Sequence, residues 1–194
     1  VVPTHREPRM IESAPIERAF DPRDTAARTS FLSSHRAQAV CTREFARLSE
    51  GLVAATKVLA VQTAIEPPTV RLSPDRCIVQ LGPVALTVAW LRNGTDVPAA
   101  GQLLCIVWRG VIAPRGEHAP ERRGWRQVPA TPQSVWEETC LPSATSEATW
   151  HWHPESLERE GYASLELASR CIDQLRTALE ALLQDAPIDS GSTT

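Results

Sequence analysis

The sequence predicts a single α+β domain, in which an antiparallel sheet of about five strands packs against a long N-terminal helix and a C-terminal helix. Two segments with apolar residues spaced three and four apart stand on either side of a central region. In that central region, short apolar stretches alternate with turn residues, which is the pattern of strands. Because the strands follow one another without helices between them, a meander of three strands plus two more is favoured over a parallel sheet.

The size and composition of the chain fit one domain with tails. The chain has 194 residues, of which 42% are hydrophobic, so a sizeable core is expected. Residues 1–29 carry four prolines among scattered charges and no apolar period, which predicts an extended tail rich in Pro and Arg. Residues 30–185 are assigned to the α+β domain, and residues 186–194 to a flexible C-terminal tail.

Residues 30–63 are predicted to form the long helix. Thr29 or Ser30 is a candidate cap, since a side-chain oxygen can accept hydrogen bonds from the free N–H groups of the first turn. Gly51 lies in the middle of this helix at a cost of about 1 kcal/mol relative to Ala, which a close approach of helix and sheet would explain. The apolar stripe of the helix consists of Cys41, Phe45, Leu48, Leu52, Ala55 and Leu59.

Three strands are predicted over residues 76–81, 84–92 and 103–111. They are rich in Val, Ile, Leu, Trp and Cys, and glycine-containing turns separate them. Side chains alternate between the two faces of a strand, so the second strand presents one larger and one smaller apolar face. The larger face, expected to cover the core, consists of Val84, Leu86, Val88 and Trp90.

A long loop and three further elements complete the predicted domain. Residues 113–133 form the loop, residues 134–139 and 148–153 two short strands, and residues 155–184 the C-terminal helix. Ser156 or Ser164 is the candidate cap of that helix. Its apolar stripe consists of Leu165, Ala168, Ile172, Leu175, Leu179 and Leu182.

Charge and cysteine content narrow the function classes. The formal net charge is -3, but residues 1–136 are net basic and residues 137–194 strongly acidic, which suggests two faces with different partners. No apolar run is long enough to cross a membrane, so no membrane insertion is expected.

Five well-separated cysteines without a paired pattern indicate buried thiols in a reducing cytoplasm. Glycine-rich phosphate-binding motifs are absent, and no cofactor is predicted.

The loop that follows the third predicted strand is the first candidate binding site. Arginine forks suit phosphate oxygens, and an exposed tryptophan can stack on a base. The alternative is a solvated loop whose tryptophan folds back onto the sheet. The residues concerned lie between positions 109 and 126 and are Arg109, Arg115, Arg122, Arg123, Trp125 and Arg126.

A weaker candidate is a metal site at His151 and His153. Two imidazoles at positions i and i+2 of a strand point to the same side, and Glu147 could add a carboxylate. The alternative is that both histidines lie on the solvent face of an edge strand while Trp150 and Trp152 point inward. The sequence favours this second interpretation, so no metal and no catalytic residue are predicted.

Three functions remain as hypotheses. The leading one is a non-enzymatic binding or assembly subunit that acts through protein–protein contacts, in a larger complex or as a homodimer. The second is a nucleic-acid-associated accessory protein that uses the arginine-rich loop 109–126. The third is a metal-dependent enzyme centred on His151 and His153.

Overall fold

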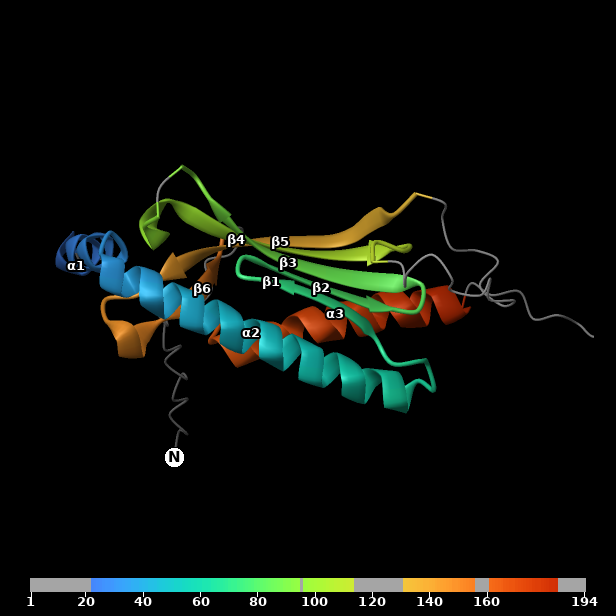
Figure 1. Cartoon of the computed structure of the whole chain (residues 1–194). Coiled ribbons are helices and arrows are strands. Elements are labelled where there is room, and N and C mark those ends of the chain that lie inside the picture. Colours follow the sequence, from blue (N-terminus) through green and yellow to red (C-terminus); the bar gives the residue numbers. More distant parts are fainter. Residues whose placement is uncertain (1–21, 95, 114–130, 156–160, 185–194) are drawn as a thin grey trace, which may run out of the picture.

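The computed structural model describes residues 22–94, 96–113, 131–155 and 161–184. It shows one six-stranded antiparallel sheet with α2 and α3 on one face and the short helix α1 at one end (Figure 1). The predicted α+β class and the antiparallel sheet between two helices are therefore confirmed. The sheet has six strands rather than about five.

The long helix α2, His35–Gln62, begins later than predicted. Its cap is Ser34, whose side chain accepts a hydrogen bond from the N–H of Ala37 at 3.1 Å. A separate helix α1, Pro22–Leu32, comes before it. Residues 22–29, which the sequence pattern assigns to an extended tail, thus lie in a helix, while residues 1–21 lie outside the described residues.

Each of the six strands pairs with its neighbours in sequence, in the order β1 to β6. The strands are β1 Thr69–Ser73, β2 Arg76–Leu81, β3 Val84–Arg92, β4 Gly101–Arg109, β5 Gln133–Ser143 and β6 His151–Pro154. The first strand is absent from the prediction. Its sequence is short, and Leu72, one of its two large apolar side chains, is 62% exposed, so its apolar pattern is weak.

The last two strands differ from their predicted limits. β5 continues through Pro142 to Ser143, beyond the predicted end at residue 139. β6 is shorter than predicted, because Glu147–Thr149 forms a short 3-10 helix instead of strand. Proline is tolerated at position 142 because it lies near the end of β5 and close to the edge of the sheet, where its neighbour is the short edge strand β6.

The C-terminal helix α3, Ser164–Gln184, begins later than the predicted residue 155. Ser164 is its first residue rather than its cap, and its hydroxyl accepts a hydrogen bond from the Trp152 indole N–H and donates one to Glu44. Helix α3 packs beside α2 on the same face of the sheet (Figure 1). A Cβ atom on Gly51 of α2 would lie 3.0 Å from Leu165 Cδ2 and 3.3 Å from Ala168 Cβ. The close approach at Gly51 is therefore between two helices and not, as predicted, between helix and sheet.

The core lies between the two helices and the facing side of the sheet. The predicted core face of β3 is confirmed, since Val84, Leu86 and Val88 are fully buried and Trp90 packs against them. The stripes of α2 and α3 cover this side, with Leu48, Leu52, Leu175 and Leu179 fully buried. Leu165, predicted as part of the α3 stripe, is 47% exposed, and Leu167 is fully buried in its place. The opposite side of the sheet, called here the outer face, carries no helix among the described residues (Figure 1).

Candidate binding surface

The outer face is built by the alternate residues of the strands. The pairing register aligns five of them in one row across the sheet, from β1 to β5. This row consists of Arg71, Ile78, Thr87, Ile106 and Glu137. Arg71 and Glu137 at its two ends are exposed, and the three residues between them are partly buried. A basic and an acidic edge therefore enclose an apolar centre.

Large apolar side chains make up much of the outer face. Ile78 of β2 stands on one side of β3, and Leu104, Ile106 and Trp108 of β4 stand on the other. All four are partly exposed. A solvated face of an antiparallel sheet ordinarily carries polar side chains at these alternate positions. The apolar content of this face therefore distinguishes it from a surface that only contacts water.

The central strand β3 contributes small side chains to the same face. Ala85, Thr87 and Ala89 lie between the larger residues of β2 and β4. Trp108 extends toward β3, because its indole N–H donates a hydrogen bond to Thr87 Oγ1 at 3.1 Å. On this smaller face of β3, Thr87 is partly exposed, whereas Ala85 and Ala89 are 0% and 6% exposed.

Gln80 secures the chain that leaves β4 at one end of the outer face. Its side-chain amide donates to the carbonyl oxygens of Gly82, Val84 and Gly110 at 2.9–3.1 Å. Its carbonyl oxygen accepts from the N–H groups of Ile112 and Ala113 at 2.8 and 3.3 Å. One buried side chain therefore fixes the backbone up to the last described residue before the arginine-rich loop.

The predicted arginine-rich site lies almost wholly outside the described residues. Arg109 ends β4 and is described. The other members, Arg115, Arg122, Arg123, Trp125 and Arg126, fall in the range 114–130, which the structure does not describe. Nucleic-acid contact by this loop therefore stays a prediction.

His151 and His153 lie on the outer face at the edge strand β6, as the alternation predicts, while Trp152 is fully buried on the opposite face. Their Nδ1–H groups are placed to donate to the carbonyl oxygens of Thr149 and Pro154, at 2.9 and 3.0 Å. No group of three or more metal-ligating side chains occurs among the described residues.

Glu147, the carboxylate that could have joined the two histidines, is engaged elsewhere. It forms a hydrogen-bonded ion pair with Arg36 of α2, and its second oxygen lies 3.9 Å from Arg43. The Arg36 contact lowers the pKa of this carboxyl. Glu147 therefore ties the 3-10 helix to α2, and its place in a metal site is not supported.

All five cysteines are free thiols and buried. Burial raises the pKa of Cys41 and of Cys140 to about 12 and that of Cys77 to about 11. The pKa of Cys105 is also raised, first by its contact with the Cys171 thiol and then by burial. A nucleophilic cysteine needs its thiolate, so these four environments oppose nucleophilic chemistry. Cys140, which lies close to Pro142 near the end of β5, is fully buried as well.

Sequence reasoning missed an ion pair that joins α3 to the sheet. Arg170 donates two hydrogen bonds of 2.9 Å to the buried carboxylate of Glu138. Its guanidinium also lies 5.9 Å from the ring centre of Trp136 and 5.5 Å from that of Tyr162. Arg170 of α3 thus joins residues that are far apart in sequence into one cluster. No local sequence pattern could reveal these contacts. The other members are Trp136, Glu138 and Tyr162.

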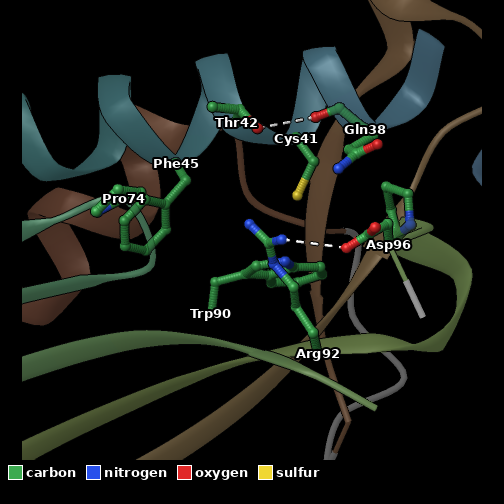
Figure 2. A pocket seen from close by; sticks show the side chains of 9 residues that line it. Gln38, Cys41, Thr42, Phe45, Pro74, Trp90, Arg92 and Asp96 are labelled. Carbon is green, nitrogen blue, oxygen red and sulfur yellow. Dashed lines mark hydrogen bonds and ion pairs between the residues drawn. The ribbon is translucent and has the colours of Figure 1, made fainter. Parts of the chain in front are cut away.

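A small hollow lies between the N-terminal half of α2 and the sheet (Figure 2). Figure 2 shows Phe45, Pro74 and Trp90 lining it, with Arg92 reaching across and pairing with Asp96 at 3.3 Å. The one thiol in its wall, Cys41, has a raised pKa. The hollow thus joins an apolar wall to one ion pair and offers no activated nucleophile.

Comparison with protein-family models, with curated proteins and with solved structures finds nothing that matches this chain. None of the described helices combines the length and the apolar character needed to cross a bilayer.

Proposed function

We propose that the protein is a binding or assembly subunit that contacts another protein chain through the outer face of its sheet. The observation that carries this proposal is the group of partly exposed apolar side chains, Ile78, Leu104, Ile106 and Trp108, on the sheet face that none of the described helices covers. Contiguous apolar surface with a polar rim is typical of protein–protein contact sites. Tryptophan is a frequent anchor of such sites, and the outer face carries Trp108 on β4.

The chemistry of the other candidate sites supports the same choice. Four of the buried thiols have raised pKa values, and Glu147 is held by two arginines. The hollow beside α2 holds one ion pair and an apolar wall. The outer face, by contrast, carries four partly exposed large apolar side chains on neighbouring strands, Ile78, Leu104, Ile106 and Trp108.

Site-specific photo-crosslinking tests this proposal. A photoreactive amino acid at Ile106 of the full chain, activated in the cells that make the protein, is expected to form a protein–protein adduct. The control is the same amino acid at Val58 on α2, which is 56% exposed but lies on the helical side.

Two results would contradict the proposal. One is the absence of any adduct specific to position 106, or an equal yield of the same adduct at position 58. The other is an adduct that nuclease treatment removes, which would identify a nucleic acid instead. A third variant, Ile106→Asp with the photoreactive residue at Thr87, is expected to lose the adduct, because a charge would be buried without a partner.

A further inference from the structure

The outer face is complementary to itself. Along the row from β1 to β5, Arg71 and Glu137 stand at the two ends, Ile78 and Ile106 stand inside them, and Thr87 is central. From either end, the order along the row is a charged residue, an isoleucine and then the central threonine. The two charged residues have opposite signs. A second copy turned by 180° would therefore meet this row with opposite charges and matching apolar side chains.

Only one direction of the twofold axis gives that match. With the axis parallel to the strands and near β3, Ile78 lies over Ile106 of the second copy, and Arg71 lies over its Glu137. An axis across the strands would place each charged residue over its own counterpart, which is repulsive. Each favourable contact occurs twice in a twofold assembly, because such an interface uses the same patch on both copies.

The neighbouring row strengthens the charge pattern. Arg76 is exposed on β2 and lies two residues from Ile78 on the same face, so the β1–β2 edge carries two arginines. Both arginines are exposed, and Arg71 also makes contacts within its own chain. Both can reach Glu137 of a second copy, since packed sheets lie about 10 Å apart and cross at about 30°.

The area of the outer face is close to what a dimer needs. Six strands spaced at about 4.8 Å, with a mean length of about 25 Å, give a face of roughly 700 Å². A standard stable interface buries about 800 Å² on each partner. Along β3 only Thr87 of the three small outer residues is partly exposed, since Ala85 and Ala89 are buried within the chain, so the larger side chains of β2 and β4 make most of the contact with the second sheet.

We infer that the chain forms a twofold dimer in which two outer faces stack, with Glu137 of each copy beside Arg71 and Arg76 of the other. This inference rests on the proposed function, because it uses the same surface, and it names a second copy of this chain as the occupant. The apolar centre supplies the contact area, and the charged edges select the axis.

A charge exchange tests the arrangement with the full chain. Light scattering and sedimentation at tens of micromolar are expected to give twice the mass of the 21.3 kDa chain. Glu137→Arg and Arg76→Glu, each alone, are expected to raise the dimer dissociation constant about tenfold, since like charges then meet twice. Mixing the two variants is expected to restore dimerisation, as a heterodimer that tags of different mass identify.

Matched control variants separate edge charge from general charge. Lys57→Glu and Glu180→Arg make the same changes at exposed positions of α2 and α3, and both are expected to leave the dimer unchanged. Circular dichroism and thermal unfolding verify that each variant is folded. Arg76→Glu is chosen over Arg71→Glu because the latter would also remove contacts within the chain.

Three results would overturn the inference. A monomeric wild-type chain rules out the dimer. A dimer that survives Ile106→Asp and both edge variants places the interface elsewhere, and mixing without heterodimer formation rejects the axis. The dimer can fail while the proposed function stands. This is the case if the chain is monomeric but still forms an adduct with a different protein at position 106. A monomeric chain that gives no intermolecular adduct at position 106 refutes both.

Discussion

At the scale of single residues, Gln80 illustrates how one polar side chain can organise a turn region. It is nearly fully buried, and its amide binds five backbone groups from three short segments. These groups would otherwise be buried without partners, which costs about 1–3 kcal/mol for each. The segment that leaves β4 is therefore held against the β2–β3 turn by hydrogen bonds more than by apolar contact.

Replacing Gln80 by leucine is expected to lower the free energy of unfolding by about 2–3 kcal/mol, because several backbone groups lose their partner. Chemical denaturation measures this change. Gln102→Leu is the control on the same face, and its effect should stay within about 0.5 kcal/mol. Equal effects of the two substitutions would show that the hydrogen bonds of Gln80 contribute no more than an ordinary surface side chain.

Ala64 occupies a backbone conformation that favours glycine. It follows α2 with φ of 53°, while Ile65 N–H donates to Ala60 carbonyl oxygen and Ala64 N–H to that of Val61. This is the Schellman arrangement at a helix end. The left-handed conformation costs a residue with a Cβ atom about 1 kcal/mol.

Ala64→Gly is therefore expected to raise the free energy of unfolding by about 0.5–1 kcal/mol. The control is Ala54→Gly, at an exposed position inside α2, which should lower it by about 1 kcal/mol. Thermal and denaturant unfolding measure both. A destabilised Ala64→Gly protein would contradict the assigned helix end.

At the scale of elements, the contact between α2 and α3 depends on Gly51. The gap at this position admits Leu165 and Ala168 of α3, so the helices approach closely where they pack beside each other. A larger side chain would separate them and disturb the apolar stripes below.

Gly51→Val is expected to destabilise the fold by about 1–3 kcal/mol through overpacking. Gly51→Ala should be nearly neutral, because better helix propensity of about 1 kcal/mol offsets the tight contact. Removing the facing side chain with Leu165→Ala should make Gly51→Ala stabilising, and a double-mutant cycle measures that coupling. Additive effects would show that the two side chains do not meet.

The ion pair between α2 and the 3-10 helix has a pH signature. Arg36 lowers the pKa of Glu147 below its ordinary value of 4.5. The folded state therefore holds this carboxylate more strongly than the unfolded state does. The resulting stabilisation is present above pH 4.5 and is lost as the pH falls through the folded-state pKa.

NMR titration of Glu147 should therefore give a pKa below 4.5, and Arg36→Ala should move it back toward that value. Arg176→Ala, on the far part of α3, is the control and should leave it unchanged. An unchanged Glu147 pKa in Arg36→Ala would remove Arg36 as the cause.

The elements that the sequence predicts best are those with a strong apolar period. The stripe of α2 and the alternation in β3 place the core correctly, and the stripe of α3 does so apart from Leu165, which is 47% exposed while the unpredicted Leu167 is fully buried. β1 has few apolar residues to bury, and α1 lies among prolines and charges, so neither gives a clear pattern. The Glu138–Arg170 pair depends on the tertiary arrangement alone. Which residues share the outer face depends on the register between strands, and no local sequence pattern specifies that register.

At the scale of the whole molecule, thiol protection reports on global folding. All five cysteines are buried between the helices and the sheet. Burial also holds the pKa of Cys41 and Cys140 near 12, so these thiols stay protonated at neutral pH.

A thiol reagent at pH 8 is thus expected to modify none of the five cysteines on the timescale of minutes, and all five after denaturation. Ser169→Cys, exposed on α3, should react within seconds and is the positive control. Rapid reaction of a native cysteine would show that the core opens locally without global unfolding.

The consecutive strand order also bears on how the chain acquires its structure during synthesis. Each strand can pair with the one made just before it, so the sheet can grow hairpin by hairpin at low entropic cost. The helix α3 follows the whole sheet along the chain, and it covers buried residues of β3 and β4. Until the ribosome releases α3, half of the nascent core has no cover. This interval is the period in which the protein would depend most on a chaperone.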